Sequence, residues 1–177
     1  TAVPSNDLWS FDVATSAWSQ LSPAGGPPLA RYFQTAIWNT ADSKMYLFGG
    51  CNAVLSVCYN DLWSFDPAVG GAGGTWAEIA DTGPPSVRFG HSAIWNTTDS
   101  KMYVFGGSLE GLNLLNDLWS YNPSTNTWTE ISDTGPPSVR DGHIAAWNSL
   151  DNKMYVFGGY NGSYLGDIWS YDIIGNT

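Results

Sequence analysis

One internal repeat constrains the fold of this chain more than any other feature. The 20-residue string at 31–50 returns at 88–107 and again at 140–159, and 14 of its 20 positions are identical in the last two copies. The seven-residue string NDLWSFD at 6–12 recurs at 60–66 and, with small changes, at 116–122 and 166–172. A period of this length indicates an array of structural units, because each unit buries its apolar surface only against a neighbour.

Each repeat predicts four short strands, which in the second copy span 91–95, 101–105, 117–121 and 127–131. The second of these strands is apolar at both alternating sets of positions, which indicates a sheet that is buried on both faces. We expect this strand to end at Gly106 and Gly107, since glycine adopts positive φ at little cost. No segment shows helical periodicity of useful length.

A four-stranded sheet with two apolar faces needs a neighbour on each side, and radial stacking of sheets into a β-propeller provides one. Four features recur in a fixed order: the diglycine after an aromatic-rich strand, the Asp-Leu-Trp-Ser-Tyr segment at 117–121, a tryptophan such as Trp128 on the fourth strand, and Arg-x-Gly-His at 88–91 and 140–143. Together they resemble kelch repeats over nearly the whole chain. The resemblance implies an all-β kelch-type propeller of four-stranded antiparallel blades, most often six or seven in a ring, with blade loops that bind partners.

The blade count predicts an open arc of about three blades. Residues 31–80 and 88–132 supply complete blades, residues 6–22 supply the third and fourth strands of one blade, and residues 140–172 supply the first three strands of another. Three and a quarter blades cannot close, because known propellers need at least four. We therefore expect residues 1–177 to be part of a six- or seven-bladed ring in a longer polypeptide.

The charge of the chain excludes two classes of partner. Six Lys and Arg side chains face 16 Asp and Glu side chains, which gives a net charge of −10 and a sequence pI near 4.1. Binding to nucleic acid or to anionic lipid needs clustered cations, so neither is expected. The apolar runs are also far shorter than the roughly 20 residues that cross a bilayer, so membrane insertion is not expected. The expected partners are another protein or further blades of the same longer chain.

The basic, histidine and tryptophan residues follow the repeat. His91 and His143 occupy one repeat position, which Gln34 takes in the first copy, and the Arg and Lys residues are equally periodic. Catalytic residues are normally unique, so these positions indicate scaffold. We expect the ten tryptophans to form core between blades, in three classes: Trp9, Trp63, Trp119 and Trp169; Trp18, Trp76 and Trp128; Trp38, Trp95 and Trp147.

Function is expected in the loops that break the repeat, between the second and third strands of each blade. Variable loops on a rigid scaffold usually carry recognition. Their candidate partner-binding residues are Val54, Leu55, Val57, Leu109, Glu110, Leu112, Leu114, Tyr160 and Tyr164. Exposed apolar clusters rimmed by polar residues mark protein interfaces. The same side chains could instead fold back onto the blade, and the sequence is compatible with both arrangements.

Cys51 and Cys58 are the only cysteines, and both lie in one of these loops. A metal or redox pair would need C-x-x-C spacing and companion ligands, so we expect a local disulfide. A disulfide indicates an extracellular or other oxidising compartment, and the glycosylation sequons at Asn96 and Asn161 agree with that. A cytoplasmic location is the alternative.

The leading interpretation is a non-enzymatic protein-interaction or assembly module. The sequence has no Ser/His/Asp, phosphate-loop or metal constellation, so we predict no catalytic, cofactor-binding or metal residue. The first alternative is a fragment of an enzyme, because some kelch-type propellers are copper oxidases similar to galactose oxidase or iron-dependent plant specifier proteins. Their reactive groups do not repeat, and the non-repeating candidates here are Cys51, Cys58, Tyr59, Glu110, Tyr160 and Tyr164. The second alternative is carbohydrate binding through Tyr160 and Tyr164.

Overall fold

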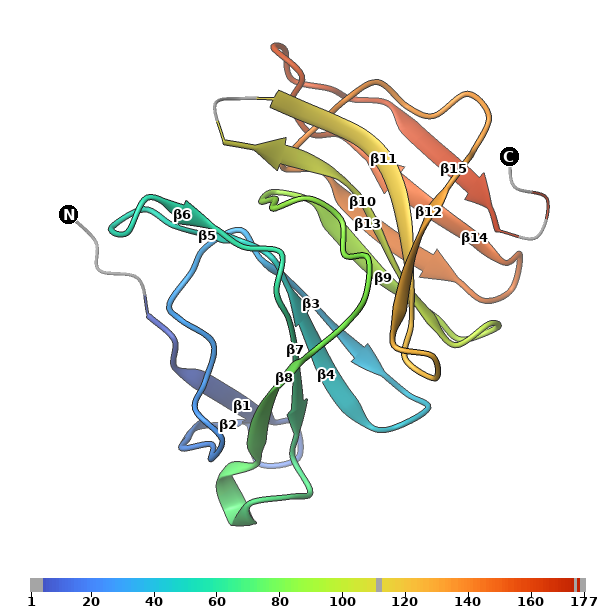
Figure 1. Cartoon of the computed structure of the whole chain (residues 1–177). Helices are drawn as coiled ribbons and strands as arrows, with labels where there is room; N and C mark the ends of the chain where they lie inside the picture. Colours follow the sequence, from blue (N-terminus) through green and yellow to red (C-terminus); the bar gives the residue numbers. More distant parts are fainter. Residues whose placement is uncertain (1–4, 111–112, 174, 176–177) are drawn as a thin grey trace.

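The computed structural model describes residues 5–110, 113–173 and 175, and these form an all-β array of antiparallel sheets (Figure 1). The first sheet pairs β1 (Leu8–Asp12) with β2 (Ala17–Leu21). The second holds β3 (Thr35–Asn39), β4 (Lys44–Phe48), β7 (Leu62–Asp66) and β8 (Thr75–Ile79). The third holds β9 (Ser92–Asn96), β10 (Lys101–Leu109), β11 (Asn113–Asn122) and β12 (Thr127–Ile131), and the fourth β13 (Ile144–Asn148), β14 (Lys153–Phe157) and β15 (Ile168–Asp172).

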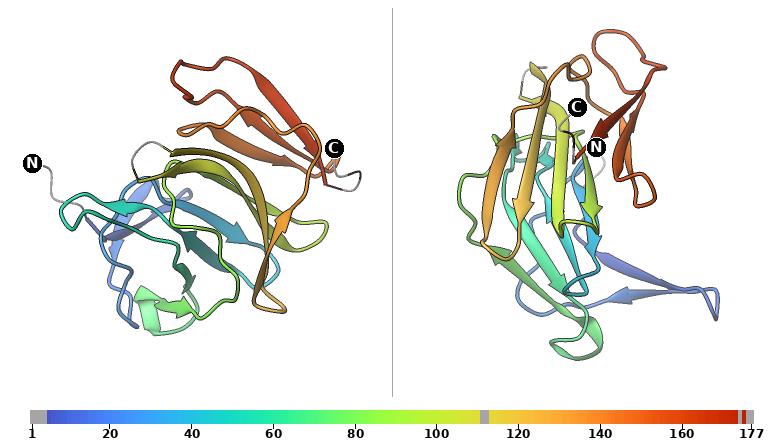
Figure 2. Two further views of the ribbon diagram at one scale, coloured as in Figure 1. Left: turned by 45° about the horizontal axis from the view of Figure 1, so that its top comes forward. Right: turned by 90° about the vertical axis from the view of Figure 1, so that its right-hand side faces the viewer.

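The sheets follow one another as an open arc, which confirms the predicted fold class. Within each sheet the strands pair antiparallel in the order of the chain, so no connection crosses over another strand of its sheet. The first strands of the second, third and fourth sheets lie side by side, because β9 contacts both β3 and β13. Figure 2 shows the same succession from two further directions, with each sheet facing the next.

Apolar side chains from facing sheets make a separate core at each boundary. Between the second and third sheets the buried cluster includes Ile37, Tyr46, Phe48, Trp95 and Trp128. Two further clusters lie at the boundaries on either side of this one. A strand such as β10 is therefore buried on both faces, as its sequence predicts.

The tryptophan prediction is correct in the middle of the arc and wrong at its ends. Trp76, Trp95 and Trp128 are buried, whereas Trp9, Trp18, Trp38 and Trp169 are exposed. Trp95 belongs to a buried cluster with Ile37 and Tyr46 from the first two strands of the preceding sheet, and the sheet that precedes Trp38 has no such strands among the described residues. The burial of these tryptophans therefore depends on a neighbouring sheet.

The last sheet exposes an apolar face whose equivalents in the preceding two sheets are buried. Phe48 and Phe105 are 0% and 3% exposed, but Phe157 at the same repeat position is 49% exposed. Leu62 is 0% exposed, whereas its equivalent Ile168 is 68% exposed. At the boundary where a next sheet is described, Phe48 packs against His91 and Trp128 of that sheet.

Two details of the strands differ from the sequence prediction. β10 does not end at Gly106 and Gly107 but continues to Leu109, with a register irregularity between Phe105 and Gly107. Both glycines have positive φ, which lets the strand bend there and go on pairing with β11. The loop after the second sheet's diglycine also forms its own hairpin, β5 (Cys51–Asn52) with β6 (Val57–Cys58). A 3₁₀ turn, η1 (Gly71–Gly73), precedes β8.

In the second, third and fourth sheets a buried arginine lies at the end where the variable loop starts. Arg88 is 0% exposed and binds Asp117 through two hydrogen bonds of 2.8 Å, one from each terminal nitrogen. Its Nη1 also donates to the Gly106 carbonyl at 3.0 Å. Burial raises the pKa of Asp117, but the hydrogen bonds and charge of Arg88 outweigh it and leave that pKa below its usual range.

The same arrangement recurs in the neighbouring sheets. Arg31 binds Asp61 and the Gly49 carbonyl, and Arg140 binds Asp167 and the Gly158 carbonyl. A tryptophan two residues after the aspartate donates its indole N–H to the same carboxylate, as Trp119 does to Asp117 at 2.7 Å. The repeat therefore preserves a complete set of partners for a buried charge.

The diglycine leaves room for the next sheet. A Cβ on Gly49 would lie 2.9 Å from the Arg88 carbonyl and 3.0 Å from the His91 ring, and its φ is +64°. Gly50 donates its N–H to that same Arg88 carbonyl at 2.9 Å. Only glycine permits this approach of two sheets.

We predict that Arg88→Ala lowers the free energy of unfolding by about 3–5 kcal/mol, because Asp117 and the Gly106 carbonyl lose their buried partner. Lys101→Ala is the matched control. Its amine lies 3.5 Å from Asp99 at the surface, so its loss should cost less than about 1 kcal/mol. Urea unfolding followed by tryptophan fluorescence measures both values, and similar losses for the two variants would contradict the prediction.

Candidate functional site

The variable loops leave the sheets at one common end. The first residue of each loop, Cys51, Ser108 or Tyr160, makes an antiparallel bridge with the residue that follows the buried arginine, which is Tyr32, Phe89 or Asp141 respectively. Each variable loop therefore lies beside the segment that enters its own sheet. In Figure 1 the β5–β6 and β10–β11 hairpins project on the same, left-hand side.

The first loop presents its apolar side chains to solvent. Val54, Leu55 and Val57 are 68%, 54% and 42% exposed. A disulfide joins Cys51 to Cys58, as the sequence predicts, at directly opposed positions of the β5–β6 hairpin. The Asn52 side chain accepts hydrogen bonds from the backbone N–H groups of Val54 and Leu55, both at 3.0 Å. The loop is therefore fixed with its apolar residues outward.

The second loop instead folds back in part. β10 and β11 extend into it, with Ser108 opposite Leu114 and Leu109 opposite Asn113, so Leu109 and Leu114 are half-buried. Glu110 is exposed, and Leu112 lies outside the described residues. The sequence missed this longer hairpin because it placed the strand end at the diglycine.

The third loop carries a pair of tyrosines. Tyr164 is 93% exposed and Tyr160 is 42% exposed, and their rings pack edge to face with centroids 5.5 Å apart. Both therefore remain accessible, on the last described sheet of the arc.

Three aromatic residues that the sequence analysis did not single out lie beside the first loop. Phe33 is 63% exposed, its ring centroid lies 5.0 Å from that of Tyr32, and it stacks on Phe89 at 6.2 Å. Tyr32, Val57, Phe89 and Glu110 line a shallow depression between the loops of the second and third sheets. The sequence does mark these residues, because the two positions after the arginine differ between the repeats. The three copies read Tyr-Phe, Phe-Gly and Asp-Gly there.

Phe33 has an unusual backbone. Its φ is +56°, and the equivalent residues in the next two copies are Gly90 and Gly142 with φ of +65° and +62°. The three backbones are linked in series, because Gly90 donates its N–H to the Phe33 carbonyl at 3.0 Å and Gly142 donates to the Gly90 carbonyl at 2.8 Å. A bulky residue at a left-handed position is strained, and such strain is concentrated at functional sites.

The two histidines bridge neighbouring sheets. His91 Nε2 lies 2.8 Å from Thr35 Oγ1, and His143 Nε2 lies 2.9 Å from Ser92 Oγ. Burial lowers the pKa of His91 to about 3, with a further contribution from the charge of Arg88, and burial likewise lowers the pKa of His143 to about 4. These contacts support a structural role for both residues.

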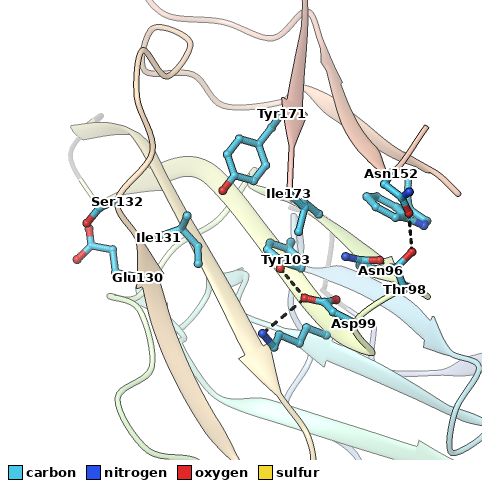
Figure 3. Close-up of a pocket in the computed structure, with 12 residues that line it drawn as sticks. Asn96, Thr98, Asp99, Tyr103, Glu130, Ile131, Ser132, Asn152, Tyr171 and Ile173 are labelled. Carbon is cyan, nitrogen blue, oxygen red and sulfur yellow. Dashed lines mark hydrogen bonds and ion pairs between the residues drawn. The ribbon is translucent and has the colours of Figure 1, made fainter. Parts of the chain in front are cut away.

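A second hollow, of about 510 Å³, lies at the opposite end between the third and fourth sheets (Figure 3). Within it the Tyr103 hydroxyl donates to Asp99 at 2.7 Å, and burial together with this bond raises the Tyr103 pKa. The same tyrosine–aspartate contact recurs between Tyr46 and Asp42 in the second sheet. These groups therefore stabilise a turn that repeats along the arc rather than a unique site.

The two candidate glycosylation sites differ. Asn96 is 1% exposed, and its side chain accepts the Thr98 N–H at 2.8 Å to hold the turn after β9. A buried asparagine has no room for a glycan, so the structure argues against glycosylation at Asn96. Asn161 lies half-exposed in the third loop and stays a prediction.

The residues proposed for an enzyme do not form one cluster. Cys51 and Cys58 are joined as a disulfide, and Arg31 lies 4.2 Å above the Tyr59 ring. In the part of the chain that the structure describes, no group of three His, Cys, Asp or Glu side chains could hold a metal ion. That same part also contains no helix long and apolar enough to cross a membrane.

Comparison with known proteins gives one match to a family over the full length. The sequence model of the KLHDC2/KLHL20/DRC7 Kelch-repeats domain matches residues 1–177. The chain is 32% identical to the Leucine-zipper-like transcriptional regulator 1 homolog of Drosophila melanogaster over 89% of its own length and 16% of that protein.

Two further relatives have different names. Kelch domain-containing protein 3 of Bos taurus is 29% identical over 97% of the chain and 46% of the relative. A protein of Thlaspi arvense named N-(sulfonatooxy)prop-2-enimidothioate sulfolyase is 31% identical over 88% of the chain and 44% of the relative. The chain thus spans less than half the length of these curated relatives.

We predict that the stability of the protein declines as the pH falls from about 6.5 towards 4, partly because of His91. Its folded pKa of about 3 lies below the ordinary value of 6.5, so in this window the unfolded state binds more protons. The variant His91→Gln has the residue that the first repeat carries at this position, Gln34. Glutamine keeps a hydrogen-bonding side chain but does not titrate. Urea unfolding at several pH values should give the variant a flatter profile, and identical slopes would refute the assignment.

Proposed function

This chain belongs to the kelch-repeat family, and on that premise we propose that it is a non-enzymatic protein-interaction module. Its proposed binding surface, here called the loop-end surface, comprises Tyr32, Phe33, Val54, Leu55 and Val57. These side chains do not repeat along the arc, and each is at least 39% exposed. Apolar residues on loops that a rigid scaffold positions are typical of recognition surfaces.

The observation that carries the proposal is Phe33. A phenylalanine in the left-handed region costs about 1–2 kcal/mol relative to ordinary backbone, and the next two copies avoid that cost with glycine. Packing does not require the side chain, which is 63% exposed. A strained, exposed aromatic beside other exposed apolar residues fits the anchor of an interface better than it fits scaffold.

The charge distribution suggests the chemistry of the partner. The chain carries a net charge of −10, and Glu110 lines the depression next to Tyr32 and Phe89. We therefore expect the partner to present apolar side chains flanked by Lys or Arg, and its association to weaken as salt screens the charges.

The arc itself is part of the proposal. We propose that residues 31–80 and 88–132 are two full blades, and residues 6–22 and 140–172 parts of two others, in a longer chain whose further blades cover the exposed ends. The exposure of Phe157 and Ile168 beside their buried equivalents supports this assembly.

Two alternatives have specific support. The name of the Thlaspi arvense relative favours an enzyme fragment, although its name describes that protein and not this chain. Carbohydrate binding is favoured by the exposed pair Tyr160 and Tyr164, because sugars stack on accessible aromatic rings. Tyr160 and Tyr164 lie outside the loop-end surface, so variants of these two residues separate carbohydrate binding from the leading proposal.

We predict that Phe33→Gly weakens partner binding with little change in stability. The substitution relieves the backbone strain but adds about 0.5–1 kcal/mol of chain entropy cost, so stability should stay within about 1 kcal/mol of the parent. Short peptides selected from a phage-displayed random library on the parent chain should bind Phe33→Gly about tenfold more weakly or worse. Titration by fluorescence anisotropy measures the affinities.

Leu150→Gly is the control for this experiment. Leu150 is 93% exposed on the turn between β13 and β14, at the opposite end of the sheets. Its loss should leave peptide affinity unchanged. Selected peptides that bind equally to the parent and to Phe33→Gly would rule out the loop-end surface, and peptides that depend on Tyr164 instead would favour the third loop.

The compartment can be tested through the disulfide. We propose an oxidising compartment, because the Cys51–Cys58 bond persists there, whereas the regulator names of some relatives favour the cytoplasmic alternative. Non-reducing peptide mapping of protein from its natural source should find the two cysteines linked. Free thiols at both positions would support the cytoplasmic alternative.

A further inference from the structure

One pair of repeat positions closes the base of each variable loop. The pairs are Cys51 with Cys58, Ser108 with Leu114, and Tyr160 with Tyr164. Each first member comes directly after the diglycine, and each second member lies three residues before the aspartate that binds the buried arginine. In every loop the two members face each other across an antiparallel pairing. The three loops are therefore closed at the same place in the repeat.

The three closures differ in their chemistry. In the second loop, strand pairing between β10 and β11 continues past Ser108, and Leu114 is half-buried. In the third loop, the rings of Tyr160 and Tyr164 pack edge to face. In the first loop, the closure is the covalent bond between Cys51 and Cys58. Of the three, only the disulfide can be broken and formed again by exchange with thiols.

The first loop has little else that keeps it closed. β5 and β6 form a separate ladder of only two residue pairs, whereas β10 and β11 add three pairs beyond their register irregularity. A short two-stranded ribbon is marginally stable at best in water. The apolar side chains Val54, Leu55 and Val57 are exposed, so their burial contributes little to holding the loop. The closed form of the first loop therefore depends strongly on its disulfide.

The two arms of the first loop are attached differently. Cys51 exchanges two backbone hydrogen bonds with Tyr32, at 2.9 and 3.0 Å, which fix the β5 arm to the segment that enters the sheet. The β6 arm pairs with β5, and the Tyr59 N–H that follows it donates to the Gly50 carbonyl at 2.9 Å. Loss of the disulfide should therefore release the β6 arm and leave the β5 arm in place.

The disulfide is accessible to a thiol. Both cysteines line the depression between the loops of the second and third sheets, which has a volume of about 270 Å³. Cys51 is 3% exposed and Cys58 is half-buried, so an incoming thiolate attacks the Sγ of Cys58. This attack forms a mixed disulfide and expels the Cys51 sulfur as a thiolate, which takes a proton. A second thiol of the reductant then displaces Cys58, which leaves two thiols in the protein and one disulfide in the reductant.

We propose that the Cys51–Cys58 bond is a redox switch for the loop-end surface. With the bond closed, Val54, Leu55 and Val57 are presented beside the aromatic residues of that surface. A dithiol opens the bond, releases the β6 arm together with these side chains, and weakens the binding of the partner. The change in the loop is independent of any partner, whereas the change in binding rests on the proposed function.

The change in the loop can be measured by amide hydrogen exchange, followed by NMR in the oxidised and the reduced chain. The chain has no other cysteine, so an excess of dithiothreitol acts on this bond alone. The Tyr59 amide should exchange at least tenfold faster after reduction, because local opening exposes it. The Ser108 amide, which donates to the Phe89 carbonyl at 2.9 Å beside the second loop, should keep its rate.

The change in binding can be measured with cysteine-free peptides selected on the oxidised parent chain. Fluorescence anisotropy should show affinity weakened about tenfold or more by dithiothreitol, because a surface that is no longer preorganised loses affinity. The double variant Cys51→Ser with Cys58→Ser should bind as weakly as the reduced parent, with or without the reductant. Phe33→Gly keeps the disulfide, so it should bind weakly while its Tyr59 amide stays protected.

Three outcomes overturn the proposal. The first is an equal exchange rate of the Tyr59 amide in the oxidised and reduced chains, and the second is peptide affinity that neither reduction nor the double variant changes. The third is an equal acceleration at Ser108, because the bond would then hold the whole array of sheets rather than one loop. Urea unfolding checks that the reduced chain and the double variant remain folded. If no peptide binds the oxidised chain, the proposed function fails, and the Tyr59 amide alone decides whether the bond controls the loop.

Discussion

The buried arginine–aspartate pair is the interaction on which the rest of this structure depends. Arg88 would be a costly charge in the interior, but Asp117 and the Gly106 carbonyl satisfy it, and the same set recurs at Arg31 and Arg140. The pair joins the segment that enters a sheet to the third strand or to the residue directly before it. It thereby fixes the point where the entering segment meets the sheet and the variable loop leaves it. The loop-end surface forms at that point.

The second constraint is that each sheet needs a neighbour. Phe48 and Phe157 share one repeat position, yet the first is buried and the second is half-exposed. The difference comes from the next sheet, which brings His91 and Trp128 against Phe48. The loop-end surface differs in this respect, because it consists of residues that the repeat does not need.

Much of the fold could be predicted from the sequence, because its causes are local. Apolar strand residues and paired glycines recur at the same positions in each repeat, and this repetition makes the strands easy to recognise. The candidate site was harder to predict. Val54, Leu55 and Val57 were identified by their departure from the repeat. Phe33 was missed because its distinguishing feature is a positive φ, which the sequence does not show. Leu109 and Leu114 were read as loop residues, whereas the β10–β11 hairpin continues past the diglycine and half-buries them.

The sequence by itself determined the family, the all-β sheets, the approximate strand positions and the pairing of the two cysteines, since periodicity and residue spacing suffice for these. Only the tertiary structure decided which tryptophans are buried, which loop side chains face solvent, and that Asn96 holds a turn from inside. It alone placed Asp81 against Trp128. Burial and hydrogen-bond partners depend on contacts between residues far apart in the chain, and a local pattern does not encode whether the neighbouring sheet is there to supply them.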